Sequence, residues 1–182
     1  MALALVNPRS LLLLLSAALL AGCTSNGPAP APPETPDALK VPAGQTLVFK
    51  AAAEGVQIYT CQAAEGAPEA FAWTLKAPEA TLFNQAHEKI GTHSAGPIWA
   101  LNDGSKLTGA VKAKADAPDS SAIPWLLLEK KSTEGTGALS KVTFIQRVHT
   151  TQGKAPAAGC DAAHAGAETR VAYTAGYYFY AP

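Results

Sequence analysis

Apolar and polar residues alternate with a period of two along much of the chain after residue 41. Residues 55–61 show this pattern: Val56 and Ile58 project to one side, and Gln57 and Tyr59 to the other. Comparable runs predict strands over residues 46–50, 70–75, 97–101, 106–111, 125–129, 142–150 and 173–180. Residues 80–83 are ambiguous between a short strand and a loop. No run longer than about ten residues keeps a helical period.

Turn-forming residues separate these predicted strands. Asp103-Gly104 lies between two apolar runs and favours a hairpin, because such turns need residues that tolerate positive φ. Many short strands with turns between them are typical of antiparallel sandwiches and barrels. The sequence therefore predicts a single all-β domain over residues 41–182, either a β-sandwich or a β-barrel. A domain of this length can bury a substantial core.

The N-terminal segment resembles the export signal of a bacterial lipoprotein. Arg9 precedes an apolar run over residues 11–20, which is shorter than the roughly 20 residues that span a bilayer. The small residues Ala21 and Gly22 then precede Cys23, as in the lipobox where the cysteine is diacylated and becomes the mature N-terminus. We therefore expect a signal peptide over residues 1–22. The alternative is an ordinary signal peptide with a chance cysteine.

Residues 23–40 are expected to be a lipidated cysteine followed by a proline-rich tether. Prolines among small residues favour extended polyproline II, and at about 3.1 Å per residue this tether would reach roughly 50 Å from the membrane. Thr24 stands where an aspartate would favour retention at the inner membrane. We therefore expect a protein of the bacterial cell envelope, held by the lipid on Cys23 at the outer membrane and facing the periplasm.

Charge and cysteine content narrow the picture further. The chain has 14 basic and 14 acidic residues, and no basic stripe interleaves with aromatic residues, so nucleic acid is not an expected partner. With Cys23 lipidated, Cys61 and Cys160 remain in an oxidising compartment. A disulfide between them would close a loop of about 100 residues. The alternative is a redox pair, which the absence of a Cys-x-x-Cys motif disfavours.

A set of short motifs carries a family resemblance across nearly the whole domain. These motifs are residues 55–61, 91–93, 96–99, 103–105, 123–127, 145–148, 159–160 and 173–180. Together they make the chain resemble the domain-of-unknown-function family 3455, found in bacteria and fungi. That resemblance implies a secreted or envelope β domain. It implies no established activity and no catalytic residues.

Motifs for metal, cofactor or nucleophilic chemistry are weak or missing in the sequence. The four histidines do not form a His-Glu-x-x-His motif, so no metal site is predicted. The glycines at 135 and 137 lack the third glycine and the following helix of a dinucleotide site, so no cofactor is predicted. No Gly-x-Ser-x-Gly elbow is present.

Candidate chemistry gathers around the predicted hairpin and one later strand. His93, Trp99, Asp103 and Ser105 surround the hairpin. Arg147 and His149 lie two residues apart in a strand, and are therefore predicted to share a face with Ile145. The alternative is that Arg147 pairs with a carboxylate and His149 closes a buried hydrogen-bond network.

Two functions from different classes follow from these residues. The first is a non-catalytic module that binds a small molecule, a glycan or an envelope protein, with Trp99, Ser105, Arg147 and Tyr173 as candidate ligand contacts. The second is a cofactor-free hydrolase or isomerase. It would use His93 or His149 as general base, with Asp103 as its acidic partner. The binding module is the first hypothesis, because no motif for chemistry is present.

Overall fold

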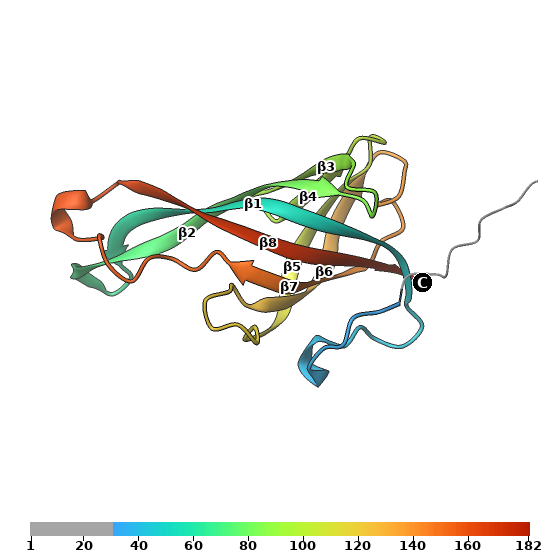
Figure 1. The fold of residues 1–182 in the computed structure, drawn as a ribbon, viewed down its shortest axis with the longest axis horizontal. Helices are drawn as coiled ribbons and strands as arrows, with labels where there is room; N and C mark the ends of the chain where they lie inside the picture. Colours follow the sequence, from blue (N-terminus) through green and yellow to red (C-terminus); the bar gives the residue numbers. More distant parts are fainter. Residues whose placement is uncertain (1–30) are drawn as a thin grey trace, which may run out of the picture.

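Eight antiparallel strands form a closed barrel in which each strand pairs with its neighbour in the chain and β8 pairs with β1 (Figure 1). The computed structural model describes residues 31–182, so Cys23 and the predicted signal peptide lie outside the described residues. The strands are β1 (Thr46–Ala64), β2 (Ala67–Phe83), β3 (Lys89–Ser94), β4 (Ile98–Leu101), β5 (Lys106–Ala115), β6 (Trp125–Glu134), β7 (Phe144–Gln152) and β8 (Glu168–Ala181). The prediction of a single antiparallel all-β domain is confirmed, and of the two architectures the barrel is the one observed.

The remaining regular structure is short. Two single turns of 3-10 helix, η1 (Asp37–Leu39) and η2 (Ala162–His164), lie outside the barrel wall. Within residues 31–182, no helix is long and apolar enough to cross a membrane.

The strand β2 is one long element where the sequence predicted a strand over 70–75 and left 80–83 undecided. The register with β1 shifts between Ile58 and Tyr59, which leaves Lys76 as an extra residue in β2. Pro78 lies next to this bulge and lacks an amide hydrogen. It is tolerated because β2 pairs with β3 only from Ala80 onward, so this part of β2 is an edge.

Three strands extend beyond the barrel as a twisted ribbon, visible at the left of Figure 1. Residues 67–79 of β2 and residues 168–172 of β8 pair with β1 alone. We call this part the three-stranded extension. The predicted Cys61–Cys160 disulfide is present here, with a Cα–Cα distance of 5.3 Å.

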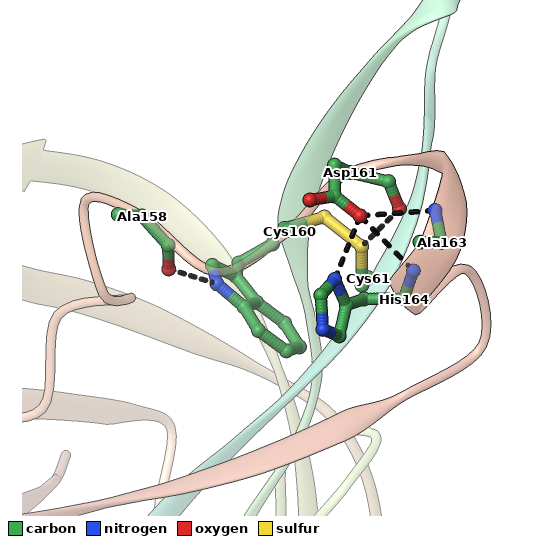
Figure 2. A network of polar contacts seen from close by, with 7 residues as sticks. Cys61, Ala158, Cys160, Asp161, Ala163 and His164 are labelled. Carbon is green, nitrogen blue, oxygen red and sulfur yellow. Dashed lines mark hydrogen bonds and ion pairs between the residues drawn. A yellow bond between two sulfur atoms is a disulfide. The ribbon is translucent and has the colours of Figure 1, made fainter.

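The loop over residues 153–167 is fastened to this extension by polar contacts as well as by the disulfide (Figure 2). The Asp161 carboxylate accepts hydrogen bonds from the Ala163 and His164 amides and thereby caps η2. The Trp73 indole donates to the Ala158 carbonyl at 3.0 Å. The extension and the loop therefore form one cross-linked unit.

The barrel interior is apolar toward the end that carries the C-terminus of β8. Inward side chains from six strands are buried there, and each Leu-sized side chain contributes roughly 1.5–3 kcal/mol to folding. They include Leu82, Trp99, Leu107, Leu128, Ile145 and Phe179. Leu139 and Val142, from the connection between β6 and β7, join the same cluster.

A second apolar cluster covers the outer face of β6 and β7. Leu39 of η1 is fully buried against Trp125, Leu127 and Val148. The backbone carbonyl of Leu39 accepts a hydrogen bond of 2.7 Å from the side-chain amide of Gln146. The tether was expected to end at about residue 40, whereas packing against the barrel begins at η1.

Candidate functional site

A cavity of about 420 Å³ opens in the barrel wall where β2 leaves the barrel for the extension. Such a volume is within the range of small-molecule sites. The strands β3 and β4 have only 6 and 4 residues, so they do not cover the flank of the long strand β2. The opening lies between residues 75–78 of β2, residues 95–97 of the β3–β4 turn, and the strands β5 and β6.

The mouth of the cavity is apolar and exposed. Leu75 of β2 and Val111 of β5 both line it, and they are 52% and 55% exposed. Val48 lies on β1, away from the cavity, and is the only other large apolar residue that is exposed in the described chain. Lys76 and Lys114 also line the mouth. Two of the three exposed large apolar side chains of residues 31–182 therefore flank one opening.

The floor of the cavity is polar and aromatic. It is made by Gln57, His93, Trp99, Arg147 and Tyr177, which come from five different strands. The His93 ring stacks on Trp99 with centroids 4.7 Å apart and lies 5.0 Å from the Tyr177 ring. Except for Arg147, which is partly buried, these side chains are at most 3% exposed. The opening thus leads from an apolar mouth to a buried polar floor.

His93 is held as a neutral ring. Burial lowers the pKa of His93 from 6.5 to about 4, and the nearby Arg147 charge acts in the same direction. Its Nδ1–H donates to the Ile98 carbonyl at 2.9 Å, because a carbonyl oxygen can only accept. The lone pair of the neutral ring is therefore on Nε2.

Several of the floor's polar atoms are buried without a hydrogen-bond partner. They are Gln57 Nε2, Trp99 Nε1, Arg147 Nε and Tyr177 Oη, together with Tyr173 Oη beneath them. Burial raises the pKa of both tyrosine hydroxyls, so both keep their protons at neutral pH. The hydroxyls of Tyr173 and Tyr177 lie close enough to interact with each other, and that of Tyr177 with Arg147. Folded proteins pair the great majority of buried polar groups, so the atoms that remain unpaired on this floor indicate a site for a ligand or solvent.

The comparison with known protein families covers this whole architecture. The model of a family of proteins of unknown function, DUF3455, matches residues 42–181. The chain belongs to the DUF3455 family. The matched span includes every strand of the barrel and every residue of the cavity. No curated protein and no solved structure matched the chain in the corresponding searches.

Asp103 and Ser105 do not line the cavity of this DUF3455 domain. The Asp103 carboxylate accepts hydrogen bonds from the Ser105 amide and hydroxyl at 2.8 and 2.6 Å, and from the Ala138 amide at 2.8 Å. These bonds lower the pKa of Asp103. The Ser105 hydroxyl accepts in turn from the Leu139 amide. Both residues therefore brace the β4–β5 turn against the connection between β6 and β7.

His149 and Arg147 do not share a face, so that prediction is wrong. The register between β7 and β8 shifts between Val148 and Thr151, and His149 has a φ of 50°. This bulge turns His149 to the exterior, where it packs against the edges of Trp125 and Tyr178. Arg147 keeps the inward direction of Ile145 and lines the cavity.

The fold therefore brings only some of the predicted site residues together. His93, Trp99 and Arg147 come together in the cavity, and Tyr173 lies next to Tyr177 beneath it. Gln57 and Tyr177 also belong to the floor, although neither was among the predicted site residues. The sequence could have indicated Gln57, because the alternation in residues 55–61 places its side-chain amide on the same face as Tyr59, which is buried.

Proposed function

We propose that this DUF3455 protein is a non-catalytic module that binds a small molecule in its barrel cavity, and that a lipid on Cys23 holds it at the bacterial cell envelope. One observation carries the binding proposal: a single opening connects exposed apolar side chains to a cluster of buried, unpaired polar atoms. Each unpaired buried group costs about 1–3 kcal/mol, and a ligand that pairs these groups would recover that free energy. Leu75 and Val111 would supply apolar contact at the mouth.

The arrangement supports binding better than the alternative of a hydrolase or isomerase. A general base works best with a pKa near the operating pH, whereas that of His93 is about 4. The Nδ1 partner of His93 is a backbone carbonyl and not a carboxylate. In the described part of the chain, no aspartate or glutamate lines the cavity.

A neutral apolar fluorophore tests the cavity directly. We expect N-phenyl-1-naphthylamine to bind the protein saturably at one site, with enhanced fluorescence. Val111→Asp should weaken this binding about five- to tenfold, because it places a charge beside the apolar part of the probe. Val48→Asp is the matched control, since Val48 is also exposed on a strand but lies away from the cavity, and it should leave the affinity unchanged. Equal effects of the two variants, or no saturable binding, would contradict the proposal.

The anchor has a separate test. Cys23→Ala should abolish incorporation of labelled palmitate and move the protein from the membrane to the soluble fraction, because one small domain with no lipid has nothing to hold it there. Thr24→Asp is the control, because it keeps the lipid and should keep the protein in a membrane fraction. A Cys23→Ala protein that stays on the membrane would refute the lipid anchor.

A further inference from the structure

We infer that the ligand of the cavity is an amphipathic monocarboxylate bound with its head inward, the carboxylate against Arg147 and the apolar part beneath Leu75 and Val111. This inference rests on the proposed function, because it names the class of ligand for the same cavity. It follows from the charge of the floor, the direction of its hydrogen bonds and the character of the mouth.

The charge of the floor is positive and has no counter-ion. An arginine side chain keeps its charge in proteins. Arg147 forms no ion pair with any carboxylate of residues 31–182, where every ion pair joins other side chains. Its Nη2 donates to the Pro124 carbonyl at 2.8 Å, and its Nε is buried without a partner. Arg147 is partly buried, and a cation that is partly removed from water and has no anion beside it would be stabilised by an anionic ligand.

The unpaired buried atoms of the floor are mainly donors, whereas the Nε2 lone pair of His93 is an acceptor. Gln57 Nε2, Trp99 Nε1 and Arg147 Nε can donate and cannot accept. The Tyr177 hydroxyl keeps its proton and can also donate. A ligand head that only accepts matches this set, and an ionised carboxylate is such a group.

The number of charges favours a monoanion over a dianion such as a phosphate monoester. Arg147 is the one cation on the floor. At the mouth, Lys76 pairs with Glu168, which leaves Lys114 as the other lysine of the lining. A second negative charge on the head would therefore be buried without a partner. Above the floor, Leu75, Val111 and Leu126 offer an alkyl or aryl group only apolar contact.

A matched ligand series tests this inference on the unmodified protein. Decanoate, decanol and decyltrimethylammonium share one alkyl chain and differ in the charge of the head. In competition with N-phenyl-1-naphthylamine, we expect decanoate to bind about 10- to 100-fold more tightly than decanol, which is the range for a hydrogen bond to a charged group. Decyltrimethylammonium should bind most weakly, because its charge repels that of Arg147.

Arg147→Gln assigns the effect to the guanidinium. This variant should bring the decanoate affinity down to that of decanol, so that the ratio of the two affinities in the variant is close to one. Lys114→Gln is the control, since it removes an exposed cation at the mouth, and it should weaken decanoate by less than about threefold. We expect Arg147→Gln to stay folded, because Arg147 is only partly buried and its replacement keeps a side-chain amide that can donate a hydrogen bond.

The outcomes separate this inference from the proposed function. Probe binding with equal affinities for decanoate and decanol would overturn the monocarboxylate and leave the binding module in place. The same holds if a neutral chito-oligosaccharide displaces the probe and decanoate does not. Absence of probe binding would overturn both. If circular dichroism shows that Arg147→Gln is unfolded, the comparison of decanoate with decanol on the unmodified protein still tests whether the ligand is a monocarboxylate.

Discussion

Replacing both cysteines of the barrel in a Cys61→Ser/Cys160→Ser variant is expected to lower the free energy of unfolding by about 4–5 kcal/mol. The disulfide joins residues 99 positions apart, and a cross-link that closes a loop of about 100 residues restricts the unfolded chain by about 4.7 kcal/mol at 25 °C in the chain-entropy model. Such a loss is a large fraction of the roughly 5–15 kcal/mol that stabilises an ordinary domain. Urea titration of the soluble Cys23→Ala form, with and without the two further substitutions, measures it.

Local contacts near the disulfide need a control of their own. Trp73→Phe removes the indole hydrogen bond to the Ala158 carbonyl without cutting the cross-link, and should cost about 1 kcal/mol. A double-cysteine variant that loses no more than Trp73→Phe would show that the loop closure contributes little. Reduction of the unmodified protein should reproduce the loss seen with serine, which separates the cross-link from the polarity of the replacements.

Acid should destabilise the domain through His93. The pKa of His93 is about 4 in the folded protein, below the ordinary value of 6.5, so the unfolded chain binds this proton more readily. The stability that neutral His93 contributes is therefore fully present above about pH 6.5. It falls as the pH falls and is lost by about pH 4, which amounts to about 3 kcal/mol. The free energy of unfolding measured from pH 4 to 7 tests this.

His93→Asn should remove this pH dependence while still offering a side-chain amide to the Ile98 carbonyl. The slope with pH is the informative quantity, because lost stacking on Trp99 lowers stability equally at every pH. His149→Asn is the matched control: this histidine is exposed, and the variant should keep the slope of the unmodified protein. Asp103 has a lowered pKa and loses its contribution only at lower pH, so it does not obscure the window. An unchanged slope in His93→Asn would contradict the prediction.

The agreement between sequence and structure is best where the signal is local. The alternation in residues 55–61 and the β-branched run over 142–150 correspond to parts of β1 and β7. Asp103-Gly104 does form the turn between β4 and β5. These features depend on side chains within a few residues of each other. The number of cysteines and the expected oxidising compartment were also enough to predict the Cys61–Cys160 disulfide, and the short motifs carried the resemblance to the family.

The site was predicted only in part, because it depends on which strands lie opposite one another. His93, Trp99 and Arg147 were candidates from the sequence. They line one cavity only because β3, β4 and β7 face a common interior. His149 was assigned to the same face as Arg147 by simple alternation, and one bulge at a positive φ reversed it. A bulge inserts a residue, and everything beyond it changes side.

Short-range patterns and residue identities predicted most of the strands, the turn at Asp103-Gly104, the disulfide and the family resemblance. Three further features appear only in the folded domain: the sheet closes into a barrel, β2 runs past its neighbours, and an apolar mouth leads to the donors around Arg147. The reason is physical: closure and register are set by pairing between residues far apart in the chain. No period along a single strand records that pairing.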